Sequence, residues 1–523
     1  MARTPAASDF DLDAAWDLHP QVAVRPEPFG ALLYHYGTRR LSFLKDRRLL
    51  DAVRALADQP RARDALLGAA CPRTISAGTG PRCPRWRPPT CSSRGPEPSP
   101  RRSRSLEGAG MVTSTATAPP PAAGRLVDHF QHGLQAPICL TWELTYACNL
   151  ACVHCLSSSG RRDPRELTTA EAKGVIDELQ RMQVFYVNIG GGEPTVRSDF
   201  WELVDYATER GVGVKFSTNG VKITPEVAAR LARSDYVDVQ ISLDGATADV
   251  NDAVRGGGSY ATAIRAMENL HEAGFREFKV SVVVTRHNAG QLDAFKAIAD
   301  RYGAQLRLTR LRPSGRGADV WDELHPTAAQ QEDLYHWLVE HGERVLTGDS
   351  FFHLSAFGSA LPGLNLCGAG RVVCLIDPVG DVYACPFAIH DRFLAGNVRD
   401  EGGFATVWRE SELFTELRRP DTGGACTRCS AYDACRGGCM AAKFFTGLPL
   451  DGPDPECVKG HGEAALRSAD RTGAPRPSGD HSHTGPVRAR PVALGMPVMP
   501  ASGRPDRFCD ESPLAGHDTR GRS

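Results

Sequence analysis

The chain has 523 residues, with 61 Lys and Arg against 62 Asp and Glu, which gives a formal net charge of −1. This length suggests about three domains, and the balanced charge argues against bulk binding to nucleic acid or to an anionic membrane. No apolar run reaches the roughly 18 residues of a membrane span, and the first residues lack the apolar core of a secretory signal. We therefore expect a cytoplasmic protein with no nucleic-acid and no membrane partner.

Residues 8–70 have the pattern of a small α+β segment. Apolar side chains first alternate, as they do in strands, at Val22, Val24, Leu32, Tyr34 and Tyr36. They then recur at helical spacing at Leu49, Leu50, Val53 and Leu56. The predicted helix ends before the segment has supplied a hydrophobic core, so we expect an incomplete domain.

Residues 71–125 differ in composition from their neighbours. The part from 72 to 110 is crowded with Pro, Arg, Ser and Gly and contains almost no aliphatic residues. Such a segment cannot bury enough apolar area to offset its chain entropy, which predicts a disordered linker. The explanation that we favour is a frame-shifted reading of the part that should have completed the first domain. Met111 could then start a separate protein, and resequencing codons 70–111 would decide.

Between residues 130 and 320, apolar strands alternate with helical stretches. The strands are expected at 138–145, 184–189, 213–217, 236–242, 278–285 and 304–310. The helices are expected between them, for example at 168–182, 198–210, 260–273 and 291–302. This alternation predicts parallel βαβ units. Six units are too few for a closed eight-fold barrel, so we predict an α/β fold with a partial (β/α)6 TIM-like barrel and ligands at the carboxyl ends of its strands.

The remaining residues divide into three parts. Residues 321–365 form a connecting region, 366–463 form a Cys- and Gly-rich domain, and 470–523 are expected to be a disordered tail. The chain has 16 cysteines. In a long cytoplasmic protein such a number indicates metal or redox chemistry rather than disulfides.

Three cysteines directly follow the first predicted barrel strand. Cys148, Cys152 and Cys155 have the spacing C-x-x-x-C-x-x-C. A [4Fe–4S] cubane normally takes four thiolates, one per iron, so a loop with three leaves one iron open to a substrate or cofactor. A structural zinc knuckle, which is the alternative, needs four closed ligands and usually has C-x-x-C spacing. The triplet therefore favours a 4Fe-4S cluster.

The Cys-rich domain holds a second and larger group of cysteines. Its members are Cys367, Cys374, Cys385, Cys426, Cys429, Cys435, Cys439 and Cys457. One metal ion cannot use eight thiolates, but two cubanes can. A pair of zinc sites is the alternative, because C-x-x-C pairs are common in zinc proteins.

The cysteine triplet is the signature of the radical S-adenosylmethionine (SAM) enzymes, which this chain resembles. The resemblance implies that the methionyl amino and carboxylate groups of SAM bind the open iron. The stretch after the second strand is similar to the GGEP motif of that family, which contacts the methionyl amino group, and it consists of Gly191, Gly192, Glu193 and Pro194. By the same resemblance Ser242 and Arg255 contact the SAM ribose or carboxylate, and ordinary capping or turn formation is the alternative for each.

The second cysteine group resembles the SPASM domain, which carries two auxiliary clusters in peptide-modifying radical SAM enzymes. The resemblance implies that one auxiliary cluster is held by Cys367, Cys374, Cys385 and Cys439. It implies that the other is held by Cys426, Cys429, Cys435 and Cys457. Clusters with four protein ligands cannot bind substrate, so we expect them to transfer electrons, most simply from an oxidised substrate radical.

From Met111 to about residue 463 the chain is similar to the mycofactocin radical SAM maturase family. Residues 19–30 and 32–39 resemble the small peptide chaperone of mycofactocin biosynthesis. Such chaperones hold a peptide by strand addition. The resemblance implies a ribosomally made precursor peptide, a separate intact chaperone and a reducing electron donor as partners. It also implies oxidative decarboxylation of a C-terminal Tyr and then a carbon–carbon bond to the preceding Val, through a 5′-deoxyadenosyl radical.

Two other functions fit the same cysteine motifs. One is another SPASM peptide modifier, either formylglycine-generating or thioether-forming, and the other is a non-enzymatic zinc-binding adaptor. The N-terminal segment can also be a generic α+β module without peptide affinity, because fold does not fix function. No residue can be named from the sequence as the general base.

Overall fold

A computed structural model of the protein describes residues 11–70, 104–105, 130, 132–342, 344–347, 351–361, 366–419, 424–472 and 476–477. The predicted linker at 71–125 and the predicted tail at 470–523 lie mostly outside these residues. The chain divides into two compact units, Met1–Leu126 and Val127–Ser523, and each is described by itself. In the described ranges no helix combines the length and the apolar character that a membrane crossing requires.

The first unit contains a three-stranded antiparallel sheet. Its strands, in spatial order, are β2 (Val22–Glu27), β3 (Gly30–His35) and β4 (Arg40–Leu44). The predicted strands are confirmed, and Leu32 and Tyr34 of the central strand are buried. A short parallel pair joins β1 (Trp16–Asp17) to β5 (Arg104–Ser105).

Helices complete the described part of this unit. They are α1 (Arg47–Ala55), the 3₁₀ turn η2 (Leu56–Asp58) and α2 (Ala62–Ala70). The sequence pattern predicts α1, whose N-terminus is capped by the Asp46 side chain, but it gives no sign of α2. Trp16 and Leu56 pack with Ala62 and Ala65, so α2 adds to a small core. Whether this unit is an incomplete domain remains a prediction.

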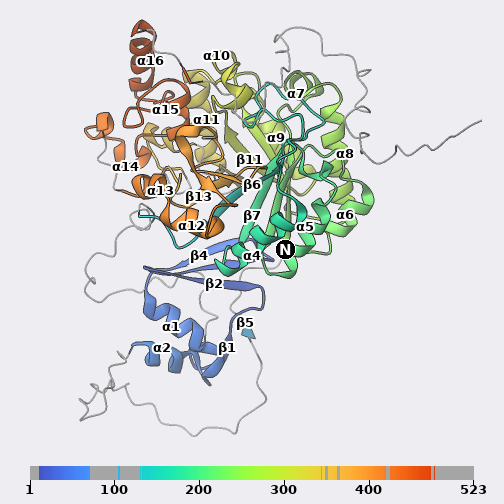
Figure 1. Ribbon diagram of the computed structural model, residues 1–523, viewed down its shortest axis with the longest axis vertical. Helices are drawn as coiled ribbons and strands as arrows, with labels where there is room; N and C mark the ends of the chain where they lie inside the picture. The colour runs from blue at the N-terminus through green and yellow to red at the C-terminus, as the bar shows by residue number, and fades with distance from the viewer. Residues whose placement is uncertain are drawn as a thin grey trace, which may run out of the picture. The chain divides into compact units, whose positions relative to one another are not determined.

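The second unit contains the predicted partial barrel (Figure 1). Its six parallel strands are β6 (Cys139–Thr145), β7 (Tyr186–Gly191), β8 (Gly213–Thr218), β9 (Val237–Ser242), β10 (Lys279–Val284) and β11 (Gln305–Arg310). The helices between them are α4 (Thr169–Arg181), α5 (Phe200–Glu209), α6 (Pro225–Leu231), α7 (Ala248–Arg255), α8 (Ser259–Glu272) and α9 (Leu292–Arg301). The predicted (β/α)6 architecture is confirmed.

The sheet extends beyond the barrel on both sides, in the order β12-β11-β10-β9-β8-β7-β6-β13-β14-β15. The added strands are β12 (Val345–Leu346), β13 (Val373–Ile376), β14 (Asp381–Tyr383) and β15 (Leu394–Asn397). β13 runs parallel to β6, and β14 and β15 are antiparallel. The first strands of the Cys-rich segment therefore continue the sheet of the barrel.

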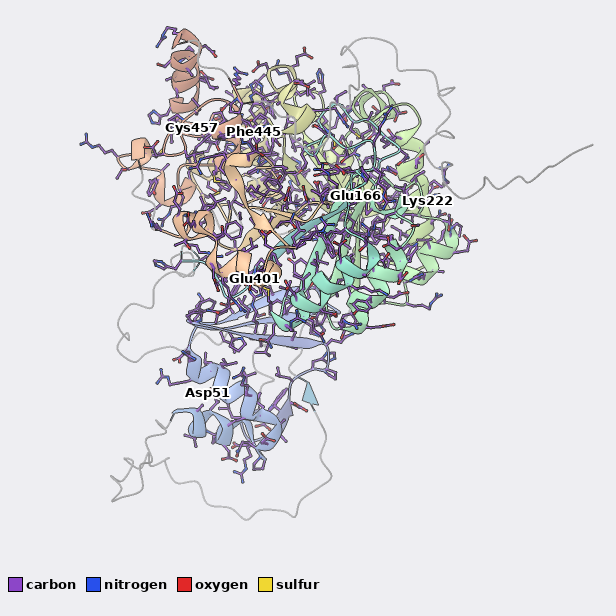
Figure 2. All side chains as sticks on the ribbon, in the orientation of Figure 1. Asp51, Glu166, Lys222, Glu401, Phe445 and Cys457 are labelled. Atoms are coloured by element: carbon purple, nitrogen blue, oxygen red, sulfur yellow. The ribbon has the colours of Figure 1, made fainter. Side chains whose placement is uncertain are left out.

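The connecting region and the Cys-rich segment also contain helices. They are α10 (Trp321–Leu324), α11 (Ala328–His341), η6 (Phe352–Phe357), α12 (Gly403–Glu410), α13 (Glu412–Leu417), α14 (Tyr432–Cys435), α15 (Met440–Phe445) and α16 (His461–Thr472). Figure 2 labels Phe445 and Cys457 in this C-terminal part of the chain.

Each barrel strand has one apolar face and one polar face. On β9, Val237, Val239 and Ile241 belong to the main hydrophobic core. The alternate residue Asp238 is also buried and forms an ion pair of 2.7 Å with Lys279 on β10. Because successive side chains on a strand point to opposite faces, the polar residues line the side of the sheet away from the core. The barrel interior can therefore accept a polar ligand.

A buried cluster of charges joins β11 to the C-terminal segment. The Arg310 guanidinium donates to the Asp454 carboxylate at 2.5 and 2.9 Å and also pairs with Glu456. The three side chains are at most 5 % exposed. Removing one partner of such a buried pair leaves an uncompensated charge, which is strongly destabilising.

We predict that Arg310→Met lowers the free energy of unfolding by about 3–5 kcal/mol, because it leaves two buried carboxylates without a cation. Thermal unfolding of anaerobically purified protein, followed by circular dichroism, measures the effect. The matched control is Arg467→Met. Arg467 pairs with Glu463 at 3.2 Å, but both side chains are more than 60 % exposed. This control should cost less than about 1 kcal/mol, and an equal loss in both variants would contradict the prediction.

Candidate functional site

The loop that carries the first three cysteines follows β6 and is fixed from two sides. Within the loop, the backbone N–H of Cys155 donates to the Cys152 carbonyl at 3.3 Å. From the segment after β11, the Arg316 guanidinium donates to the carbonyls of Cys152 at 2.9 Å and Ser159 at 2.8 Å. The predicted triplet is thus brought together at the carboxyl ends of the barrel strands.

The thiols of this loop lie in surroundings that disfavour the bare thiolate. Burial raises the pKa of Cys148 well above its usual range and raises the pKa of Cys152 to about 11. The neighbouring thiols raise both pKa values further, and Arg255 opposes the shift at Cys152. A metal-bound thiol is deprotonated, so a bound cation would remove this penalty. The donor set therefore fits an iron–sulfur cluster.

The predicted GGEP stretch packs against the cysteine loop. Gly191 has φ +109°, and a Cβ on Gly192 would lie 2.0 Å from the Ala147 carbonyl oxygen. The Glu193 N–H donates to that same carbonyl at 2.8 Å. Pro194 begins the 3₁₀ turn η3 (Pro194–Val196). Only glycine fits such a close approach, so the motif and the cysteine loop form one surface.

Glu193 fixes the loop through its buried side chain. Its carboxylate accepts hydrogen bonds from the hydroxyls of Thr195 at 2.6 Å and Thr218 at 2.8 Å and from the Asn219 N–H at 2.7 Å. Burial raises the pKa of Glu193, and these hydrogen bonds oppose the rise. Glu193 therefore ties the end of β7 to the end of β8, and both of its carboxylate oxygens already accept hydrogen bonds from the protein.

Ser242 and Arg255 lie at the same end of the barrel. Ser242 ends β9, and the Arg255 guanidinium is 2.6 Å from the Asp244 carboxylate. The same carboxylate is 2.7 Å from His154 Nε2, and the two partners hold the pKa of Asp244 far below its usual range. Arg255 thus sits beside the cluster loop as part of a buried network. Contact of Ser242 or Arg255 with SAM remains a prediction.

The first auxiliary set is partly brought together. Burial raises the pKa of the Cys385 thiol, and the nearby Cys367 and Cys439 raise it further. Cys374 lies on β13 and is fully buried. The Gly370 N–H donates to the carbonyl of Val373, which precedes Cys374, and to the carbonyl of Ala384, which precedes Cys385. These contacts place the predicted ligands around one turn.

The second auxiliary set lines one pocket. Cys426, Cys429, Cys435 and Cys457 all contribute to its wall. Burial raises the pKa of Cys435 to about 12, and Asp454 and Cys457 add to the shift. No three His, Cys, Asp or Glu side chains of the described ranges converge on a single metal ion. A [4Fe–4S] cubane does not require several side chains to converge on one ion, because each of its irons takes a single thiolate.

Buried polar atoms without a partner gather at the carboxyl ends of the barrel strands. They include Glu143 Oε2, His154 Nδ1, Ser158 Oγ, Thr285 Oγ1, Arg312 Nε and Ser314 Oγ. Buried polar groups are normally hydrogen-bonded, so each of these needs an explanation. A bound polar ligand at this end of the barrel would supply the missing partners.

Several residues of this region were not predicted from the sequence. Asp244 stands two residues after Ser242, just after the strand predicted at 236–242. This position was only a weak indication that Asp244 belongs to the site. His154 lies inside the cysteine triplet and could have been suspected as a neighbour of the cluster. Arg316 gave no signal, because its contact with Cys152 spans 164 residues of sequence.

Comparison with protein families agrees with this geometry. Residues 142–296 match the radical SAM superfamily, and residues 367–430 match an iron–sulfur cluster-binding domain, SPASM. Residues 15–77 match the peptide chaperone MftB family. The barrel, its cysteine loop and the second cysteine domain thus define the class: the protein is a radical SAM enzyme that uses SAM and iron–sulfur clusters.

Curated relatives narrow the class to one family. The chain is 73 % identical over 392 residues to "Mycofactocin maturase MftC" of Mycolicibacterium smegmatis, covering 75 % of this chain and 98 % of the relative. It is 69 % identical over 400 residues to the protein of the same name from Mycobacterium tuberculosis strain H37Rv, covering 76 % and 100 %. The chain belongs to the mycofactocin maturase family.

Solved structures agree on the fold. The crystal structure of Streptococcus suis SuiB bound to precursor peptide SuiA matches with a TM-score of 0.58 at 16 % identity. The match covers 84 % of this chain and 99 % of that chain. At this identity the likeness shows the shared barrel and SPASM architecture alone.

We predict that Gly192→Ala displaces Ala147 and with it the adjacent Cys148, because the new Cβ would meet the Ala147 carbonyl oxygen at 2.0 Å. The variant should then keep about 8 of about 12 irons. Iron analysis of anaerobically purified protein measures the loss. Gly190→Ala is the control, because no atom lies within 4 Å of its added Cβ. Full iron content in both variants would show that the close packing is dispensable.

Proposed function

We propose that the protein is a maturase that acts on the C-terminal Val-Tyr of a mycofactocin-type precursor peptide. In this reaction the Tyr is oxidatively decarboxylated, and a carbon–carbon bond to the neighbouring Val then forms. The observation that carries the proposal is the 73 % identity to a mycofactocin maturase over 98 % of that protein. The three-cysteine loop after β6, within the residues that match the radical SAM superfamily, supports it.

In this proposal Cys148, Cys152 and Cys155 hold the SAM-binding 4Fe-4S cluster. When bound, SAM and the cluster supply a 5′-deoxyadenosyl radical that removes a hydrogen atom from the peptide. The backbone of Gly191, Gly192, Glu193 and Pro194 would hold the methionyl amino group of SAM. The role of Glu193 is to keep that backbone in place, because its own carboxylate is filled by Thr195, Thr218 and Asn219.

The polar side of the barrel is the proposed substrate site. Glu143 faces it from β6, is 2 % exposed and has one carboxylate oxygen without a partner. Burial raises the pKa of Glu143 well above its usual range. Ser314, from the segment after β11, adds a second unpaired buried oxygen. A bound peptide would fill these positions and exclude water from the reacting atoms.

The two sets of four cysteines are the proposed ligands of two auxiliary clusters. The first set is Cys367, Cys374, Cys385 and Cys439, and the second is Cys426, Cys429, Cys435 and Cys457. Oxidative decarboxylation removes two electrons from the peptide. One leaves with the abstracted hydrogen atom, and the other needs an acceptor, for which a cluster without an open iron is suited. A separate reducing donor supplies the electron that starts each cycle.

The N-terminal unit is the proposed peptide-binding part. Its residues 15–77 match the MftB peptide chaperone family. In the three-stranded sheet β3 is central, so β2 and β4 are the edges to which a peptide strand could be added. A separate intact chaperone remains a proposed partner. The thiol chemistry suits the reducing cytoplasm as the place of action.

We predict that the reduced protein, with SAM and a peptide ending in Val-Tyr, releases carbon dioxide from the terminal Tyr. The measurement is mass spectrometry of the peptide together with 5′-deoxyadenosine. A matched peptide ending in Val-Phe lacks the phenol hydroxyl and should react at least tenfold more slowly. The reason is that a site built to hydrogen-bond a substrate hydroxyl discriminates strongly against an analogue without that hydroxyl. An unchanged peptide despite 5′-deoxyadenosine formation would favour another SPASM modifier.

A variant with Cys148, Cys152 and Cys155 all replaced by Ala separates the cluster roles. It should lose SAM cleavage completely and keep about 8 of about 12 irons, because both auxiliary sets remain. Iron and zinc analysis of anaerobic protein measures this. Colourless, zinc-loaded wild-type protein would instead support the adaptor function, and undiminished SAM cleavage in the triple variant would contradict the proposed site.

A further inference from the structure

Arg312, which follows β11, is a buried cation without a carboxylate partner. It is 5 % exposed, and its Nε makes no hydrogen bond. One terminal N–H group donates to the Arg310 carbonyl at 2.8 Å, and the guanidinium lies 4.5 Å from the centre of the Phe387 ring. In the described ranges no acidic side chain pairs with it. By contrast, the neighbouring Arg310 has two carboxylate partners.

Arg418, which is partly buried, is a second arginine without a carboxylate partner in the part of the chain that the structure describes. Its Nε donates to the Gly370 carbonyl at 2.8 Å, and its guanidinium stacks 4.6 Å from the centre of the Trp408 ring. The buried Nη2 has no hydrogen-bond partner. Burial lowers the pKa of Arg418. The described residues again provide no carboxylate for it.

Both guanidiniums face the first auxiliary set. Phe387, whose ring lies under Arg312, is two residues from Cys385. Gly370, which Arg418 holds, donates its N–H to the carbonyls just before Cys374 and Cys385. Two arginines without a described carboxylate partner therefore lie beside the segments that carry Cys374 and Cys385, two members of one predicted ligand set.

The charge balance identifies the missing partner. A buried cation without an anion is costly. Four thiolates around a [4Fe–4S] core carry a net negative charge. Such a cluster would compensate both arginines.

We propose that Arg312 and Arg418 are positioning residues for the first auxiliary cluster, whose negative charge they balance and whose reduction potential they raise. Reduction adds one electron, so a nearby cation stabilises the reduced form more than the oxidised form. The cluster then becomes a better acceptor for the electron released by the peptide. This inference rests on the proposed function only for the presence of that cluster.

The test measures reduction potentials without peptide, so its failure is separate from failure of the Val-Tyr reaction. The background is the triple alanine variant of Cys148, Cys152 and Cys155, in which only auxiliary clusters remain. In it, Arg312→Gln should shift one of two potentials, followed by electron paramagnetic resonance, to more negative values. The expected change is at least tenfold in the equilibrium constant for reduction, or about 59 mV for one electron.

Three further variants make the result decisive. Arg312→Lys keeps the charge and should shift the potential less, whereas Arg418→Gln should shift the same cluster as Arg312→Gln. Arg392→Gln is the control and should shift nothing, because Arg392 is exposed and already lies 4.0 Å from Glu416. If Arg312→Gln fails to fold, Arg418→Gln carries the test. Unchanged potentials in every folded variant would overturn the proposal.

Discussion

The pairing of β6 with a strand on each side is the constraint on which the rest of the structure depends. β7 lies on one side and places Gly190 opposite Glu143. β13 lies on the other side and places Cys374 opposite Leu140. The loop with the first three cysteines grows from the end of β6 itself. One strand register therefore sets the distance between the SAM motif, the cysteine loop and the start of the second cysteine domain.

Local patterns in the sequence were sufficient to predict the strands and helices of the barrel. Apolar residues alternate on each strand because one face meets the helices, and strands such as β9 and β10 could be predicted from that alternation. Thr168 and Glu171 likewise form the capping box that opens α4. The spacing of the cysteines also indicated which thiols would gather, as the pocket formed by Cys426, Cys429, Cys435 and Cys457 shows.

Contacts between distant segments could not be predicted in the same way. Arg255 was predicted to face SAM, but its partnership with Asp244 and His154 depends on how β9 and the cysteine loop meet. The hold of Arg316 on the cysteine loop depends on the packing of the segment after β11. Helix α2 was missed because its Ala-rich sequence has little periodic contrast. In each case the decisive energy comes from tertiary packing rather than from local propensity.

Asp454 connects three parts of the molecule through its carboxylate and its backbone carbonyl. It pairs with Arg310 of the barrel, accepts the Cys439 N–H at 2.7 Å, and its own carbonyl accepts the Cys457 N–H at 3.0 Å. The two cysteines belong to different predicted ligand sets. Damage that frees this aspartate would loosen both sets and the barrel together.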